Sequence, residues 1–219
     1  MYRFVKRAFD IIASFLGMVV TSPVWLIAII GIEISDPGPV FYMARRVVEN
    51  DREVSMFKFR SMRIGRAKEN TFRGDTDRIF PWGKIIRKLK IDELPQLINV
   101  FLGDMSVVGP RPAAPDQTEI TRGGKFKRVS EAPAGLTGPS ALYDYIYGDS
   151  IEDEEEYEKL VLPTRLELDL YYIDNRGVFY DIKMIWYTVV CILYSFVGKV
   201  PQGIYKELIE CVDKEKEMV

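Results

Sequence analysis

The amino-acid sequence predicts a mostly helical α+β fold with an N-terminal segment in a membrane. The stretch from Ile11 to Ile32 contains no charged residue and is long enough to cross a bilayer as a helix. Residues 54–62 alternate apolar and polar side chains, which indicates a strand with one buried face. Residues 79–90 place apolar and basic side chains on opposite faces of a helix. Beside an apolar N-terminus, this pattern favours a helix at the membrane interface over a surface helix packed on a protein core.

Ser22 and Pro23 stand near the middle of the charge-free stretch. A proline inside a helix removes one backbone donor and frees the carbonyl four residues earlier, here that of Val19. The Ser22 hydroxyl can supply a local hydrogen bond at this place. Taken alone, the stretch fits either a spanning helix with a tolerated proline or a segment that enters the membrane and turns back.

The remaining sequence indicates a series of short elements. Residues 35–42 predict a turn that leads into a β-prone run. A helix is expected from about Glu93 to Leu102, with Asp92 as its N-cap and Gly103 at its end. Other expected elements are a helix after Pro163, a buried or interfacial helix at 184–198, a loop or short helix at 64–78, a rigid turn at 133–140 and an exposed acidic segment at 149–159.

The absence of histidine from all 219 residues excludes several kinds of site. Ser-His-Asp and Cys-His nucleophile systems and histidine-ligated zinc are ruled out. Cys191 and Cys211 have no motif spacing and fit packing residues in a reducing compartment. Residues 45–90 hold 14 Lys and Arg against 6 Asp and Glu. This basic region indicates a phosphate, nucleotide or anionic-lipid partner, unless it only attracts the acidic residues 149–174.

The candidate site is the carboxylate pair Asp92–Glu93, hereafter the dyad. Acidic residues at the start of a helix are often only caps that complement the helix dipole. Fixed cations nearby favour a phosphate site instead. In such a site one carboxylate can attack phosphorus or bind a divalent cation, while the other acts as a general base. The cations expected around the dyad are Lys58, Arg60, Arg87 and Arg111, the last of them in Gly109-Pro110-Arg111-Pro112.

The longest informative motif is IDELPQLINVFLGDMSVVGPRP at 91–112. It occurs with KRAFD at 6–10, the Ser22–Pro23 pair, DPGPVFY at 36–42, KFRSM at 58–62, GLTG at 135–138 and LDLYYIDNRGVFYDIKMI at 168–185. Together these segments resemble the bacterial sugar transferases, the monotopic polyprenyl-phosphate phosphoglycosyl transferases. Two positions depart from the family pattern, because Ala44 and Val48 replace its Gln and Gly, although Arg46 keeps its Arg. This departure leaves the donor sugar open.

The resemblance implies transfer of a phosphosugar from a UDP-sugar to polyprenyl phosphate, the first membrane step of glycoconjugate biosynthesis. Asp92 would be the nucleophile that holds the phosphosugar covalently while UMP leaves. Glu93 would assist proton removal from the lipid phosphate or help to hold the site. Mg²⁺ is expected near Asp92, where it would neutralise the diphosphate. The implied phosphate and substrate residues are Lys58, Arg60, Arg87, Arg111 and Pro112.

The same resemblance decides between the two placements of the membrane segment. The positive-inside rule puts the basic N-terminal residues in the cytoplasm, and a spanning helix would separate the dyad from cytoplasmic nucleotide sugars. We therefore expect residues 1–34 to form a re-entrant helix–break–helix, broken at Ser22 and Pro23. Residues 35–219 would form a catalytic domain on the cytoplasmic face of the bacterial inner membrane. Expected partners are the UDP-sugar, undecaprenyl or another polyprenyl phosphate, membrane lipid and downstream glycosyltransferases, but no nucleic acid.

Two other functions fit parts of the sequence. The same carboxylates would serve a membrane-bound, Mg²⁺-dependent phosphatase or pyrophosphatase, which needs no lipid acceptor. A non-catalytic module would assemble other glycan enzymes through its acidic residues 149–174. The intact motif at 91–112 argues against this last interpretation.

Overall fold

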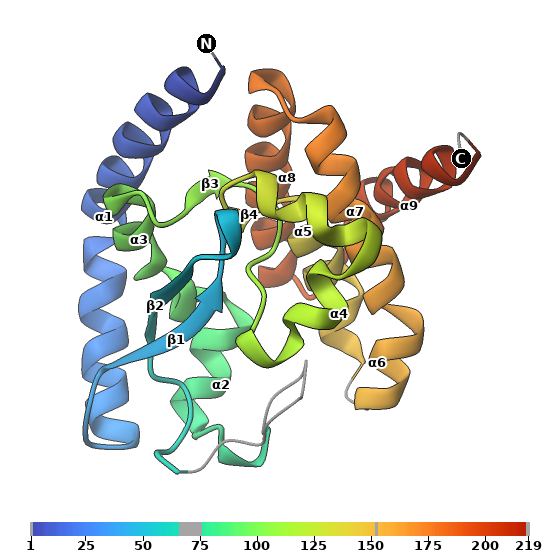
Figure 1. The fold of residues 1–219 in the computed structure, drawn as a ribbon. Helices are drawn as coiled ribbons and strands as arrows, with labels where there is room; N and C mark the ends of the chain where they lie inside the picture. Colours follow the sequence, from blue (N-terminus) through green and yellow to red (C-terminus); the bar gives the residue numbers. More distant parts are fainter. Residues whose placement is uncertain (1, 66–75, 152, 218–219) are drawn as a thin grey trace.

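The computed structural model describes residues 2–65, 76–151 and 153–217. Within these ranges the chain is mostly helical and has two small two-stranded sheets, which confirms the expected α+β class. Helix α1 (Tyr2–Ser35) runs along one side of the domain (Figure 1). Helix α8 (Val178–Phe196) stands behind the sheets.

Helix α1 packs on the domain along one face. Buried side chains recur on it from Lys6 and Asp10 to Ala28 and Ile32, at the spacing of a single helical stripe. The helix contacts elements along the side of the domain and does not project away from it. The apolar cluster under its C-terminal half consists of Ala28, Ile32, Phe59, Phe80 and Ile86.

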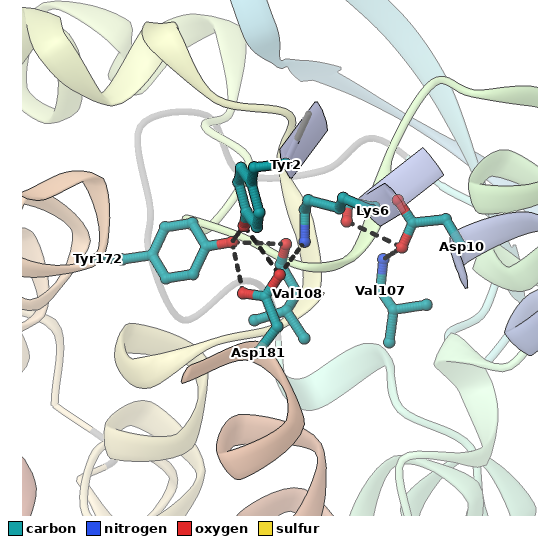
Figure 2. Close-up of polar contacts among 8 residues, drawn as sticks. Tyr2, Lys6, Asp10, Val107, Val108, Tyr172 and Asp181 are labelled. Atoms are coloured by element: carbon teal, nitrogen blue, oxygen red, sulfur yellow. Dashed lines mark hydrogen bonds and ion pairs between the residues drawn. The ribbon is translucent and has the colours of Figure 1, made fainter. Parts of the chain in front are cut away.

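A buried carboxylate holds the first turns of α1 in place (Figure 2). Asp181 of α8 accepts hydrogen bonds from Lys6 Nζ and Tyr2 OH, each at 2.8 Å. Tyr172 OH donates to the other oxygen of Asp181 at 2.9 Å. Both charged partners are less than a tenth exposed, so each satisfies a charge that would be costly to bury alone.

A second buried carboxylate of α1 ties the helix to β3 (Ser106–Val108). Asp10 accepts a hydrogen bond from the backbone N–H of Val107 at 2.9 Å (Figure 2). It also accepts one from Ser106 Oγ at 3.0 Å. The strand leads directly into the segment that carries Arg111. The motif at 6–10 therefore joins the membrane segment to a candidate site residue.

The expected break at Ser22 and Pro23 does not interrupt the helix, because α1 continues through Pro23 as one 34-residue element. Ser22 Oγ donates to the carbonyl oxygen of Val19 at 2.8 Å. This is the carbonyl that Pro23 leaves without its backbone donor. The expected local hydrogen bond is present, but it preserves the helix instead of ending it. That both ends of α1 lie on one face of the membrane stays a prediction.

Two helices in the described part of the chain are long and apolar enough to cross a membrane, namely α1 and Val178–Ser195 of α8. Much of their apolar surface is not covered by the domain, as the 81% and 90% exposed side chains of Phe4 and Phe179 show. A surface of this composition indicates membrane association. The helix expected at 184–198 thus begins earlier, at Val178.

Strands β1 (Phe41–Val47) and β2 (Glu53–Phe59) form an antiparallel hairpin, which confirms the strand and the β-prone run expected from the sequence. The short 3₁₀ helix η1 (Glu49–Asp51) closes it. The register pairs Tyr42 with Lys58, so these side chains lie on the same face of the hairpin.

Helix α2 (Pro81–Lys88) packs against α1 and confirms the amphipathic helix expected here. Gly83 and Ile86 are buried on its inner face, and Lys84 is exposed. The side chain of Ile85 is 46% exposed, although it was expected on the apolar face with Ile86. The position of helix α2 at a membrane interface stays a prediction.

The dyad lies in a separate 3₁₀ turn, η3 (Ile91–Glu93), before α3 (Gln96–Leu102). The helix expected from Glu93 therefore begins three residues later, and Asp92 is not its N-cap. Pro95 occupies the N-cap position, and Gly103 ends the helix with φ of 95° as expected. The Asp92 carboxylate is consequently not used to cap a helix.

Strand β3 pairs in parallel with β4 (Gly135–Thr137). Strand β4 lies in the segment 133–140, which was expected to be a turn. The sequence did not predict the strand, because three residues are too few to show a periodic pattern. An added Cβ at Gly135 would lie 2.1 Å from the backbone nitrogen of Gly109, so the close approach of the two chains requires glycine.

The largest hydrophobic core lies among α5 (Pro139–Ile146), α7 (Leu162–Asn175), α8 and α9 (Gln202–Glu217). Helix α7 confirms the helix expected after Pro163. The acidic segment forms α6 (Glu154–Leu160). The remaining elements are η2 (Thr76–Arg78), η4 (Pro115–Gln117), α4 (Thr118–Arg122), η5 (Gly124–Glu131) and η6 (Gly148–Ser150); most of the loop expected at 64–78 lies outside the described residues.

Candidate active site

A cavity of about 110 Å³ lies between the β1–β2 hairpin, the segment after β3, and helices α5 and α7. Its wall contains four residues that the sequence predicted for the site, namely Lys58, Glu93, Arg111 and Pro112. The wall also contains Arg46 and Gln96, which were not among the predicted site residues. The structure thus brings together named side chains that are up to 66 positions apart in the sequence, from Arg46 to Pro112.

Glu93 is tied to a cation of the hairpin. Lys58 Nζ lies 2.9 Å from Glu93 Oε1, and both side chains are about one-quarter exposed. Burial alone would raise the pKa of Glu93, but the charges of Lys58, Lys90 and Arg111 hold this pKa well below its usual range. An ionised and paired carboxylate is a weak base. Of the two roles open to Glu93, the arrangement favours holding the site over removing a proton.

Asp92 differs from its neighbour in both solvent access and bonding. Its side chain is 6% exposed and stands beside the cavity instead of in the wall. Burial and the charge of Glu93 raise the pKa of Asp92 to about 6. Its Oδ1 has no hydrogen-bond partner among the described residues. Asp92 therefore keeps a free and comparatively basic oxygen, as a nucleophile or metal ligand requires.

Arg111 is fixed at both its backbone and its side chain. Its backbone N–H donates to Asp169 Oδ1 at 3.0 Å, and the same oxygen accepts from Ser140 Oγ at 2.5 Å. Its guanidinium pairs with Asp144 Oδ2 at 3.1 Å. The guanidinium is therefore held at the cavity by α5, and the backbone is held by α7.

Arg46 faces the cavity together with Arg111. Burial and the like charge of Arg111 lower the pKa of Arg46. Two neighbouring cations in one cavity wall are stabilised by an anion between them, such as a diphosphate. The resemblance pointed to this position, because Arg46 is the Arg of the family pattern that this chain keeps.

The structure does not bring the other two predicted cations into the cavity wall. Arg60 is 5% exposed, and its guanidinium donates to Asp36 and to the carbonyl oxygen of Pro39. It fastens the turn between α1 and β1 and is not placed to hold a substrate phosphate. Arg87 lies near enough to Asp92 that its charge lowers the pKa of Asp92, but it does not line the cavity.

The donor atoms at the dyad fit a magnesium ion. No group of three His, Cys, Asp or Glu that would hold a metal by itself occurs in the described part of the chain. Mg²⁺ usually needs only one or two carboxylates and completes its shell with water and substrate phosphates. The unbonded Oδ1 of Asp92 suits this coordination, whereas Glu93 is engaged by Lys58.

Comparison with known proteins places the chain in a family. The model of the bacterial sugar transferase family matches residues 1–195. A UDP-N-acetylgalactosamine-undecaprenyl-phosphate N-acetylgalactosaminephosphotransferase of Aeromonas hydrophila is 34% identical over 89% of this chain. A UDP-glucose:undecaprenyl-phosphate glucose-1-phosphate transferase of Escherichia coli is 35% identical over 90% of it. The exopolysaccharide production protein ExoY of Rhizobium meliloti is 31% identical over 87% of it.

The chain belongs to the bacterial sugar transferase family, and it is a transferase. It spans less than half of the larger relatives, namely 45% of the Aeromonas protein and 41% of the Escherichia protein. It spans 86% of ExoY. Helix α9 lies beyond the residues that the family model matches.

Proposed function

We propose that the protein transfers a phosphosugar from a UDP-sugar to polyprenyl phosphate through a covalent aspartyl intermediate. One observation carries the proposal: Asp92 keeps a free, basic carboxylate oxygen beside a cavity lined by cations. The names of the Aeromonas and Escherichia relatives supply the substrate classes, a UDP-sugar and undecaprenyl phosphate. Neither the sugar nor the length of the polyprenol follows from the cavity.

In the first step a carboxylate oxygen of Asp92 attacks the sugar-bearing phosphorus of the donor. A bond forms between this oxygen and phosphorus, and the bond to the bridging oxygen of the diphosphate breaks. UMP leaves with that oxygen and its electron pair. The guanidinium groups of Arg46 and Arg111 and the Lys58 ammonium stabilise the charge that develops on the phosphate oxygens.

In the second step a phosphate oxygen of the lipid attacks the same phosphorus. The bond from phosphorus to Asp92 breaks, and the carboxylate is restored. A lipid phosphate is largely ionised near neutral pH, so this step needs little help from a base. Glu93 accordingly keeps the Lys58 ammonium in place.

A Mg²⁺ ion held by Asp92 would neutralise part of the charge of the diphosphate and of the leaving UMP. With or without this ion, the cationic side chains around the dyad bind and orient the donor. Because Arg111 is fixed by Asp144 and Asp169, its guanidinium is preorganised for a phosphate.

The catalytic domain lies against the cytoplasmic face of the inner membrane, and both ends of α1 are on that face. The close packing of α1 along the side of the domain and its exposed apolar side chains support this placement. A cysteine at position 4 (Phe4→Cys) in a Cys191→Ser, Cys211→Ser background would test it with an impermeant thiol reagent. Labelling of intact cells from the periplasmic side alone would contradict the placement.

A screen of UDP-sugars with undecaprenyl phosphate and Mg²⁺ tests the reaction. We expect at least one UDP-sugar to release UMP and to yield the lipid-linked diphosphosugar, and we expect a chelator to stop this release. A phosphatase or pyrophosphatase would instead release inorganic phosphate or sugar phosphate without any lipid. That outcome would replace the transferase by a hydrolase using the same carboxylates.

A further inference from the structure

The backbone of Lys90 starts the turn that carries the dyad. Lys90 has φ of 54° and ψ of 21°, a left-handed conformation that is unfavourable for a residue with a side chain. The N–H of Glu93 donates to the carbonyl oxygen of Lys90 at 3.2 Å. The position of the dyad thus depends on a strained residue that its surroundings must hold in place.

The side chain of Lys90 reaches the segment formed by α5 and η6. Its Nζ lies 2.9 Å from Asp149 Oδ2 and 5.0 Å from the centre of the Tyr145 ring. The aromatic ring and the carboxylate therefore fix the ammonium from two sides. The sequence indicated only a general attraction between the basic residues 45–90 and the acidic residues 149–174, and it did not single out this pair, whose members are 59 positions apart.

The same short segment also holds Arg111, a cation of the cavity wall. Asp144 of α5 pairs with Arg111, and Asp149 of η6 pairs with Lys90. One continuous segment, 139–150, thus makes two ion pairs, one to the loop that carries Arg111 and one to the turn that carries Asp92. The relative position of the nucleophile and the phosphate-binding guanidinium depends on both.

We propose that the Lys90–Asp149 ion pair is a clasp that fixes the dyad turn relative to Arg111, which makes Lys90 and Asp149 positioning residues for the transfer. The inference rests on the proposed function of Asp92. The two side chains are 32% and 43% exposed, and a pair this accessible contributes little to the stability of the fold. Its effect is therefore on geometry, where a displacement of about 1 Å can cost 100-fold in rate.

A substitution of Asp149 distinguishes the clasp from an effect of local charge alone. Lys90→Met removes a cation from the neighbourhood of the phosphate, and would weaken catalysis under either explanation. Asp149→Asn removes an anion, which would leave activity unchanged or increase it if only the local charge mattered. A clasp instead requires that Asp149→Asn lower the activity, because either substitution releases the turn that carries the dyad.

The test is a double-mutant cycle on the full-length protein, with UMP release as the readout. We expect Lys90→Met and Asp149→Asn each to lower kcat about tenfold, the double variant to be no worse than Lys90→Met, and Lys90→Arg to stay near wild type. Thermal unfolding should change little. The matched controls are Lys84→Met, an exposed cation of α2, and Arg52→Met, which breaks a 2.9 Å ion pair with Asp104 outside the cavity; both should keep the wild-type kcat.

Wild-type or higher activity of Asp149→Asn would overturn the clasp, as would effects that multiply in the double variant. Amide hydrogen exchange gives a readout that does not depend on the reaction. Loss of the clasp should speed exchange of the Glu93 amide in both single variants but not in Lys84→Met, and equal exchange in all variants would also overturn it. Full activity of Asp92→Asn would refute the proposed function, while the exchange result would still decide the clasp.

Discussion

Lys58 Nζ lies 2.9 Å from Glu93 Oε1, so one carboxylate of the dyad is committed to a cation of the β1–β2 hairpin. Its neighbour Asp92 keeps an oxygen that has no hydrogen-bond partner in the described part of the chain. Adjacent residues of the same chemical type therefore have opposite properties. The paired carboxylate is held ionised, and the unpaired one is more basic and free to react.

This difference predicts unequal effects of two isosteric substitutions. Asp92→Asn removes the nucleophile and should lower UMP release by about 1,000-fold or more, because no covalent intermediate forms. Glu93→Gln removes only a positioning charge and should lower it about 10–100-fold. Glu119→Gln, an exposed carboxylate on α4, serves as the control and should have no effect. Equal losses in the two dyad variants would contradict the assigned roles.

The raised pKa of Asp92 predicts that the ionised Asp92 carboxylate lowers the stability of the folded protein above acidic pH. Folding raises this pKa from 3.8 to about 6, so between these values the unfolded chain releases a proton that the folded protein keeps. Stability due to this group is lost as the pH rises through this window, and the loss persists above it.

Asp92→Asn should therefore be more stable than the wild type at pH 8 by roughly 1–3 kcal/mol, and the difference should vanish below about pH 4. Urea unfolding of both proteins at the two pH values measures the effect. A less stable Asp92→Asn at pH 8 would show that the Asp92 carboxylate is stabilised, not strained, by its surroundings.

The buried pair Lys6–Asp181 predicts strong anchoring of α1. Lys6→Met leaves a buried carboxylate without its cation and should cost about 3–5 kcal/mol. Arg3→Met breaks the ion pair with Glu49, but the Arg3 side chain is 73% exposed, so the cost should stay below about 1 kcal/mol. Denaturant unfolding in one detergent compares the two variants, and similar costs would argue against a buried anchor.

The hydrogen bond from Ser22 to Val19 predicts a dependence on the neighbouring proline. Ser22→Ala should destabilise the protein by about 1 kcal/mol, because the Val19 carbonyl then has no donor. In a Pro23→Ala background the backbone N–H of residue 23 supplies that donor, so the same substitution should cost almost nothing. Equal costs in both backgrounds would show that Ser22 acts in another way.

The elements with strong local signals could be predicted from the sequence. The alternation after Glu53, the amphipathic pattern around Ile86 and the glycine at the end of α3 each have a local physical cause. Strand β4 could not be predicted, since its three residues pair with β3 through long-range contacts. At Pro23 the hydrogen bond from Ser22 was expected, but its effect was not, because this bond keeps the helix continuous instead of ending it.

The site was predicted in part for the same reasons. The dyad, Lys58 and Arg111 belong to motifs that carry the family resemblance, and three of these four residues meet at one cavity. Arg60 belongs to such a motif too, but its partner is Asp36, which makes it structural. Lys90 could not be recognised, because its significance depends on Asp149 from a distant segment.

Intact-protein mass spectrometry tests the covalent mechanism most directly. The protein is mixed with a UDP-sugar that the screen identifies as a substrate, and the lipid acceptor is left out. We expect a mass increase of one phosphosugar, one UMP released per protein molecule, attachment to Asp92, and loss of the adduct when polyprenyl phosphate is added. The Asp92→Asn protein should gain no mass. UMP release that always requires the acceptor and never yields an adduct, or an adduct on another residue, would contradict the covalent mechanism.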